Sequence, residues 1–514
     1  MKKSIKINQI NILCVVLLLF STAILAQKVK PTPKPKSKTT QTKPKTTVKT
    51  APKTTPKTTD LEDPFSFELN KNLQELTSPE YVAKQQKAEE LYKKGLAHWK
   101  NLDIQPAIDA FTEAIKIYPN YIAALGERGT VNFMINKPEL ALPDFDAVLK
   151  LEAENAKFLT LRGQTLTKIA LKIKETQIDY KPAADNAQKA LADFNKALEI
   201  EPNNSNYYSY RGNLLLEFDF VKESIADFKK AIELNPTNDY AYRYLGYAKF
   251  LADDGMGVTE LGKAIELSPK NPESYYLRGQ VNRGLGLLDE ALKDFSKAIE
   301  LSKYNSEYYN ARGMIYFRKQ DGNAAVKDFS KAIDERRDYG TAYFNRAMTY
   351  KKFPYSVSTD ENINPFAKLG MQHRKMMEDF SSAIKFKPNM ADAYIQRGLL
   401  NSTSMEINIG GKLDQETITE LNTALADFQQ AIKIDSKSAE AYNGRASCYD
   451  QLGKKDLALA DYSKAIELDP EIVTAYMGRM GIYCEMGKKE LSIIDEKKIK
   501  ELGFATINVC NLGR

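Results

Sequence analysis

The segment Ala291–Leu301, which reads ALKDFSKAIEL, recurs along this chain of 514 residues at a nearly constant interval. Six of the nine steps between corresponding positions are 33 or 34 residues, and three are longer. A fixed period over most of a chain requires a repeat architecture, because each unit has an apolar face that only a neighbouring unit can cover. The other copies begin at Ala107, Ala141, Ala190, Ser224, Val258, Ala325, Met376, Ala424 and Ala458.

Each unit has the pattern of two helices. Ala291, Phe295, Ala298 and Ile299 recur at i, i+4, i+7 and i+8, which places them on one helical face. The segment Tyr275–Gly279 precedes them in the same unit, and its Tyr-x-x-Arg-Gly pattern fits a first helix whose small residue allows close helix packing. The unit is therefore a helical hairpin, and hairpins of this kind bury their apolar faces by stacking.

The hairpins resemble tetratricopeptide repeats (TPR), whose pattern has aromatic residues at positions 4 and 24, small residues at 8, 20 and 27, and proline at 32. In the sixth unit the matching residues are Tyr275, Gly279, Ala291, Phe295 and Ala298. The resemblance implies an all-α, right-handed superhelical solenoid of about ten hairpins across residues 88–472, with terminal capping helices. It also implies a protein that binds other proteins.

Position 7 departs from the family pattern, because it carries arginine where an apolar residue is usual. A charge on this inward stripe needs a partner, and position 23 offers a carboxylate that the guanidinium fork can bind bidentately. We expect an ion-pair ladder, within or between hairpins, with a basic groove for an anionic ligand as the alternative. Its arginines are Arg128, Arg162, Arg211, Arg278, Arg312, Arg346, Arg397, Arg445 and Arg479, and its carboxylates are Asp144, Asp193, Asp227, Glu260, Asp294, Asp328, Asp379, Asp427 and Asp461.

The N-terminal residues form two segments outside the repeats. Residues 1–26 combine early lysines with an apolar run, which predicts an export signal, with an uncleaved membrane anchor as the alternative. Residues 27–60 predict a disordered linker, because residues 28–59 contain ten Lys, six Pro, eleven Thr and no acid. Removing these ten lysines and the three in the signal from the formal charge of +7 leaves −6 for residues 60–514.

The remaining boundaries concern the ends and the interruptions of the array. We expect an N-terminal capping segment at 61–87, and C-terminal capping helices and a tail at 473–514, with 488–500 as a truncated, polar closing helix. Three insertions, near 165–184, 351–371 and 401–417, fall at the turn within a hairpin, either as partner contacts or as tolerated drift.

Cys448 and Cys484 are expected to be buried thiols, although one disulfide among Cys448, Cys484 and Cys510 is compatible with an oxidising compartment.

The resemblance also implies a ligand surface, because the first helices of such hairpins line a concave groove. The positions that change from unit to unit there are 2, 5, 6 and 9. They carry tyrosine, amide and arginine side chains, which combine stiff apolar area with hydrogen bonding. An ordinary wet surface is the alternative. The candidate groove residues are Tyr210, Asn213, Arg243, Tyr244, Tyr247, Tyr276, Gln280, Asn310 and Asn345.

The sequence therefore favours a non-catalytic interaction scaffold, exported to the periplasm or beyond, that binds a peptide or helix of a bacterial envelope protein. The alternative is a module that binds an anionic envelope polymer through its basic linker. No catalytic residue, metal site or cofactor is expected, since His98 and His373 lie in different units without a nucleophile beside them. Nucleic acid is an improbable partner for a chain whose repeat region is acidic, and the oligomeric state stays open.

Overall fold

The computed structural model describes residues 78–255, 257–354, 363–403 and 413–505. The predicted export signal (1–26), the linker (27–60), residues 61–77, Cys510 and the central parts of the second and third insertions lie outside these residues. The described residues form helices α3 to α24 and no strand. None of these helices is both long and apolar enough to cross a membrane.

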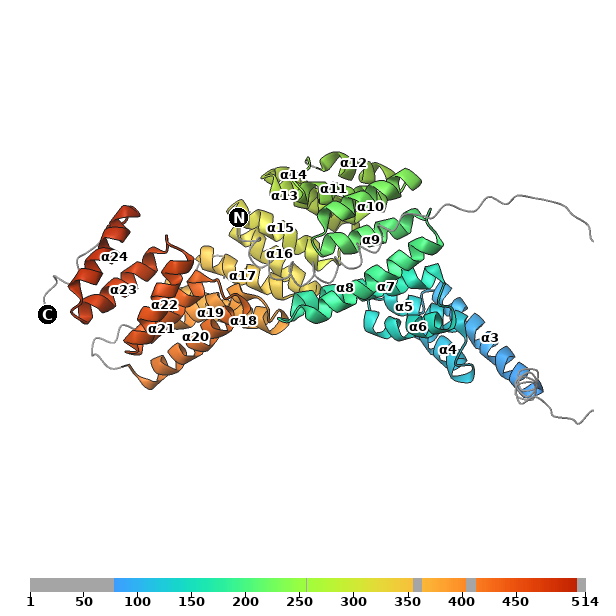
Figure 1. Ribbon diagram of the computed structural model, residues 1–514, viewed down its shortest axis with the longest axis horizontal. Coiled ribbons are helices and arrows are strands. Elements are labelled where there is room, and N and C mark those ends of the chain that lie inside the picture. Colours follow the sequence, from blue (N-terminus) through green and yellow to red (C-terminus); the bar gives the residue numbers. More distant parts are fainter. Residues whose placement is uncertain (1–77, 256, 355–362, 404–412, 506–514) are drawn as a thin grey trace, which may run out of the picture. The chain divides into compact units, whose positions relative to one another are not determined.

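Successive helices pair as antiparallel hairpins, from α3 with α4 to α23 with α24 (Figure 1). The chain divides into two compact units, described here separately, and the division passes through α7 and α8 at residues 169/170 and 187/188. The helices up to that division are α3 (Pro79–Lys100), α4 (Ile104–Ile117), α5 (Ile122–Met134), α6 (Pro138–Leu151), α7 (Ala156–Thr176) and α8 (Lys181–Ile200).

The second unit contains residues 170–187 and everything from Glu201 onward. Its helices are α9 (Ser205–Glu217), α10 (Val221–Leu234), α11 (Asp239–Leu251), α12 (Val258–Leu267), α13 (Pro272–Gly284), α14 (Leu288–Leu301), α15 (Ser306–Arg318), α16 (Gly322–Glu335), α17 (Gly340–Lys352), α18 (Pro365–Phe386), α19 (Ala391–Thr403), α20 (Gln415–Ile434), α21 (Ala439–Gln451), α22 (Lys455–Leu468), α23 (Val473–Glu485) and α24 (Lys489–Glu501).

A phenylalanine on the second helix packs against a glycine on the first helix and holds the two helices of a hairpin together. Phe295 on α14 is fully buried, and a Cβ atom placed on Gly279 of α13 would lie 2.7 Å from its ring. The glycine therefore lets the two helices approach closely enough to enclose the ring, and Ala291 and Ala298 complete the buried stripe of α14. This arrangement confirms the all-α repeat fold that the sequence predicts.

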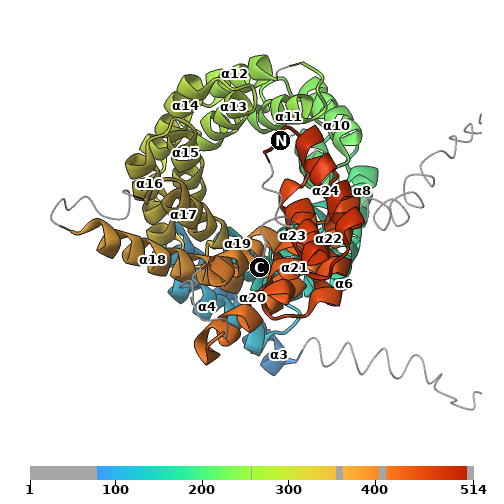
Figure 2. The ribbon, with the colours of Figure 1, turned by 90° about the vertical axis from the view of Figure 1, so that its left-hand side faces the viewer.

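The two helices of each hairpin take different sides of the stack in the second unit. The first helices α9, α11, α13, α15 and α17 contact one another from hairpin to hairpin. In Figure 2, α11, α13, α15 and α17 lie on the inner side of a curved stack, and α12, α14 and α16 lie on its outer side. The side formed by α9, α11, α13, α15 and α17 is called the inner face below.

All nine predicted position-7 arginines form bidentate ion pairs within their own hairpins. In the seventh hairpin, Arg312 donates from Nε and Nη2 to the two carboxylate oxygens of Asp328, at 2.8 and 2.9 Å. The nine aspartates are between 1% and 8% exposed, so each arginine neutralises a buried charge. The ninth carboxylate, Asp495, was absent from the predicted set, and it pairs with Arg479.

The same guanidinium groups also join neighbouring hairpins. Arg346 donates from Nη1 to the hydroxyl of Ser330 in the preceding hairpin, at 3.0 Å. Arg397 and Arg479 make the equivalent bonds to Ser381 and Ser463. The ladder therefore forms contacts both within hairpins and between them. Because each arginine pairs with a buried aspartate, these arginines have a structural use and do not form a basic groove.

The fifth hairpin lacks this pair, because Leu245 replaces the arginine. Glu260, expected as the carboxylate of the ladder, forms an ion pair with Lys249 instead. The backbones also approach more closely here, since a Cβ atom on Gly246 would lie 2.5 Å from the carbonyl oxygen of Gly257. Two glycines thus replace the usual ring-against-glycine contact in this hairpin.

The ends of the array differ from the sequence expectation. Helix α3 begins at Pro79, so residues 79–87 belong to the first hairpin rather than to a separate capping segment. At the other end, α23 and α24 form a complete eleventh hairpin, and α24 exposes Ile493 and Ile494, so it is neither truncated nor wholly polar.

Cys448 and Cys484 differ in burial and in oxidation state. Cys448 is free and fully buried, and burial raises the pKa of its thiol to about 12. Cys484 is half-buried and disulfide-bonded, so its interpretation as a buried thiol was wrong.

The ladder predicts an asymmetric response to substitution. Arg312→Met leaves the carboxylate of Asp328 buried and unpaired, and we expect a local loss of about 3–5 kcal/mol. The double variant Arg312→Met/Asp328→Leu removes both charges and should recover most of that loss. Because repeat arrays open locally, hydrogen exchange of α15 and α16 is the measurement. Equal exchange in the single variant and the native chain would contradict a structural ladder.

Candidate functional site

The inner face of the second unit brings the predicted groove residues onto five consecutive first helices. They lie on α9 (Tyr210 and Asn213), α11 (Arg243, Tyr244 and Tyr247), α13 (Tyr276 and Gln280), α15 (Asn310) and α17 (Asn345). All are half-buried except Arg243, which is 6% exposed. They therefore share one face on which solvent access is limited.

Tyrosine rings contact one another in two groups on this face. The ring of Tyr240 lies 5.7 Å from that of Tyr210 and 4.6 Å from that of Tyr244, measured between centroids. Further along, the rings of Tyr276 and Tyr308 are 5.0 Å apart. Burial raises the pKa of Tyr240, Tyr244 and Tyr276 above the ordinary range of tyrosine. Their hydroxyls therefore stay protonated and can donate hydrogen bonds.

Amide side chains on the same face are only partly satisfied. Gln280 donates to the hydroxyl of Tyr276 at 2.7 Å, and Asn345 donates to Oδ1 of Asn310 at 2.9 Å. In contrast, Oδ1 of Asn213 and Oε1 of Gln280 are buried and accept no hydrogen bond from the described residues. A buried acceptor without a donor costs about 1–3 kcal/mol, so a ligand that supplies an N–H or O–H group would gain stability here.

Arg243 is the most unusual member of the set. Its guanidinium lies 5.1 Å from the ring centroid of Tyr240 and 5.4 Å from that of Tyr244. Nε and Nη1 have no acceptor among the described residues, and the nearest carboxylate, that of Asp239, is 3.8 Å from Nη1. The cation is thus held by aromatic rings and a loose ion pair rather than by a bidentate carboxylate.

The sequence analysis missed two glutamates and two tyrosines on this face. Tyr308 donates to the carboxylate of Glu273 at 3.0 Å. Burial raises the pKa of Glu273 and of Glu217 above the ordinary range. Glu273 and Tyr240 occupy position 2, one of the variable positions, so this position could have identified them. Tyr308 and Glu217 lie outside these positions, and no sequence signal marked them.

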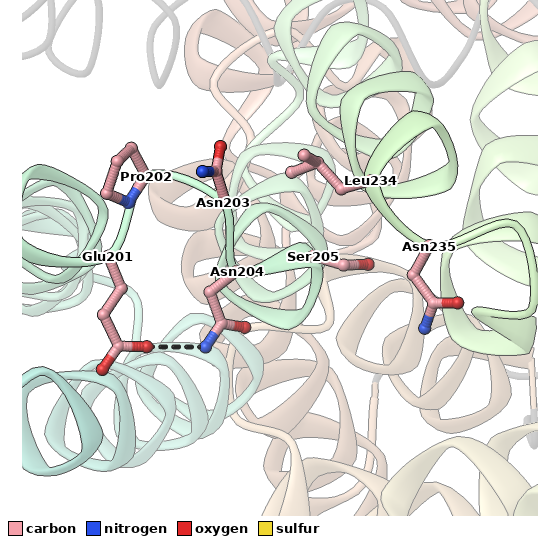
Figure 3. Close-up of a pocket in the computed structure, with 7 residues that line it drawn as sticks. All are labelled: Glu201, Pro202, Asn203, Asn204, Ser205, Leu234 and Asn235. Atoms are coloured by element: carbon pink, nitrogen blue, oxygen red, sulfur yellow. Dashed lines mark hydrogen bonds between the residues drawn. The ribbon is translucent and has the colours of Figure 1, made fainter.

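A pocket of about 510 Å³ lies at the turn between the third and fourth hairpins, away from the predicted residues (Figure 3). It is lined by Glu201–Ser205, Leu234 and Asn235, and the amide of Asn204 donates to the carboxylate of Glu201 at 2.9 Å. An earlier turn repeats this bond with Asn155 and Glu152. This hydrogen bond is therefore a recurrent feature of the turns.

The first insertion makes specific hydrogen bonds within the second unit. It lengthens α7 and α8, and Lys174 near the end of α7 donates to the backbone carbonyl of Glu217 at 2.6 Å. The amide of Asn389, between α18 and α19, donates to the carbonyls of Lys174 and Gln177 at 3.1 and 3.2 Å. The insertion thus contacts both the end of α9 and a turn that lies more than 200 residues after the insertion itself.

Stacked helical hairpins with a partly unsatisfied polar inner face define a helical-repeat protein of the solenoid class. Models of the family described as tetratricopeptide repeat match residues 272–305, 306–339 and 439–472. The chain thus contains tetratricopeptide repeats. Comparison with curated protein sequences finds no match.

Several solved structures are similar to this chain. A tetratricopeptide repeat protein from Parabacteroides merdae is 21% identical, with a TM-score of 0.43 over 51% of this chain and 99% of its own. YrrB, a TPR protein with an unusual peptide-binding site, is 21% identical, with a TM-score of 0.32 over 43% of this chain and 97% of its own. Yeast Tom70 is 17% identical, with a TM-score of 0.40 over 82% of this chain and 97% of its own.

The contact of the first insertion predicts a local effect of Asn389. Asn389→Asp keeps the shape of the side chain but replaces the N–H donors by a carboxylate that repels the two carbonyls. We expect the C-terminal turn of α7 to lose about 1–3 kcal/mol of protection, seen as faster hydrogen exchange of residues 172–177. Asn203→Asp, at an exposed turn, is the matched control. Identical exchange in both variants would mean that the contact does not restrain the insertion.

Proposed function

We propose that this protein is an exported, non-catalytic scaffold of the bacterial cell envelope that holds a peptide or helix of a partner protein against its inner face. Tetratricopeptide repeats are typical of protein-interaction scaffolds. The lysines and apolar run of residues 1–26 support export.

The observation that carries the proposal is the set of polar atoms without partners on one face. Asn213, Arg243 and Gln280 lie on three consecutive first helices, and each has a buried donor or acceptor that the described residues leave unsatisfied. A bound backbone segment offers both N–H and C=O groups along its length, and it could satisfy acceptors and donors together. The neighbouring tyrosines add stiff apolar contact area.

The second candidate function is binding of an anionic envelope polymer through residues 28–59. The observation that favours it is the ten lysines of that segment, which contains no acid. Contacts of this kind weaken strongly as ionic strength rises, whereas contacts with the partly buried inner face weaken much less. The dependence of binding on salt concentration therefore distinguishes the two functions.

The test is a pull-down from envelope extract with the full chain, at low salt and at about 0.5 M salt, read by mass spectrometry. Tyr244 packs against Phe228, so its removal would also weaken the core. Asn213→Ala/Gln280→Ala changes the face without that cost, and Asn203→Ala at an exposed turn is the control. We expect a partner that survives high salt and is lost only with Asn213→Ala/Gln280→Ala. Partners that all disappear in high salt and ignore this variant would favour the basic segment.

A further inference from the structure

The end of the first insertion, which belongs to the second unit, lies between the two ends of the inner face. Lys174 donates to the backbone carbonyl of Glu217, the last residue of α9, and its Nζ atom lies 5.2 Å from the ring centroid of Phe218. Asn389, in the turn that follows α18, donates to the carbonyls of Lys174 and Gln177. The same short segment therefore contacts α9 and a turn that lies four hairpins further along the stack.

The turn that holds Asn389 packs against the start of α17, at the other end of the inner face. A Cβ atom on Gly340, the first residue of α17, would lie 2.9 Å from the Cβ atom of Lys387. Burial raises the pKa of Tyr339 above the ordinary range, and the charge of Glu175 in the insertion adds to this rise. Helices α9, α11, α13, α15 and α17 thus form an arc whose two ends are joined by the insertion.

The inner face also curves tightly between these ends. Burial, and then the charges of Asp219 and Glu307, raise the pKa of Glu217 above the ordinary range. Glu307 is on α15, and α11 and α13 stand between that helix and α9. Charges more than about 10 Å apart are largely screened, so the side chains of α9 and α15 approach one another. An α-helix with its side chains is about 10–12 Å wide, whereas an extended strand needs only about 4.8 Å toward each neighbour.

We propose that the first insertion closes the inner face of the second unit into a ring, which admits an extended polypeptide through its free end and excludes a helix or a folded loop. The inference rests on the proposed function, because it narrows which part of a partner protein the inner face holds. A closed ring has no gap between its ends through which an internal loop of a folded partner could enter.

The unsatisfied atoms of the inner face favour the same kind of segment. Oδ1 of Asn213 and Oε1 of Gln280 are buried and lack a donor among the described residues. A helix uses nearly all of its backbone N–H groups in its own hydrogen bonds, so it could meet these acceptors only through side chains. An extended backbone has N–H and C=O groups free along its whole length.

The first test measures which reagents reach the inner face of the full-length chain. Asn310→Cys places a thiol on α15 at the inner face, and Asn323→Cys on the exposed side of α16 is the matched control. Each variant is labelled with a linear polyethylene-glycol maleimide and with a maleimide carried by a folded domain of similar mass. The native chain, whose Cys448 is fully buried, measures the background.

We expect the folded reagent to label Asn310→Cys about tenfold or more slowly than the linear reagent does, because it must wait for a local opening. The two reagents should label Asn323→Cys at similar rates. Similar rates in Asn310→Cys as well would show an open face and would overturn the proposal.

The second test releases the insertion in the Asn310→Cys chain. Asn389→Ala removes both hydrogen bonds to the end of α7, and Asn203→Ala at an exposed turn is the control. We expect Asn389→Ala to speed labelling by the folded reagent about tenfold, because the ring opens more often. Labelling by the small reagent N-ethylmaleimide should stay the same, which would show that the fold is intact. An unchanged rate for the folded reagent would mean that the insertion does not close the face.

The third test separates this inference from the proposed function. Gln177→Cys/Asn389→Cys, joined by a short bismaleimide linker, keeps the ring closed, and the unlinked double variant is the control. We expect both forms to retain the same partner in the pull-down. A partner lost only from the linked form would support the scaffold function and overturn entry by a free end. Loss of every partner from both forms would contradict the scaffold function, whereas the labelling rates, which need no partner, would still decide whether the ring is closed.

Discussion

The bidentate pair between an arginine on the first helix and an aspartate on the second is the interaction on which the stack depends. The carboxylate is almost fully buried, so it requires the arginine. The arginine uses its third nitrogen, Nη1, to bind the preceding hairpin, as Arg346 does with Ser330. One side chain therefore fixes the geometry within a hairpin and the register between hairpins. Replacing it by an apolar residue would remove both functions at once.

The fifth hairpin shows what happens where this interaction is absent. Leu245 leaves no guanidinium to bridge the helices, and the backbones of Gly246 and Gly257 meet directly instead. An arginine is still present two residues earlier, as Arg243, but its place on the inner face removes it from the carboxylate position. The break in the ladder and the most unusual residue of the candidate site thus occur in the same helix, α11.

The sequence predicted the repeat fold and the arginines of the ladder because these depend on a period that recurs many times. It could not predict contacts that occur once. Asp495 lies in a hairpin without the aromatic anchor, so pattern matching passed over it. Asn389 meets residues more than 200 positions earlier, and no local pattern encodes that distance. On the inner face, variable positions identified Tyr244 and Gln280, but they could not show which polar atoms remain unsatisfied.

Different positions of the hairpin serve the fold and the candidate site, and this explains why the site can differ from those of similar repeats. The ring, the small residues and the ladder occupy the interface between the two helices of a hairpin, where substitution costs stability. The amide residues of the inner face contact a neighbouring first helix, as Asn345 contacts Asn310, whereas Tyr244 also packs against Phe228 in the core. A tetratricopeptide repeat can therefore change what it binds without changing how it folds. The polar atoms left unsatisfied on α9, α11 and α13 are a cost that closing the hairpins does not require, and this cost is the physical basis of the proposal that a ligand covers them.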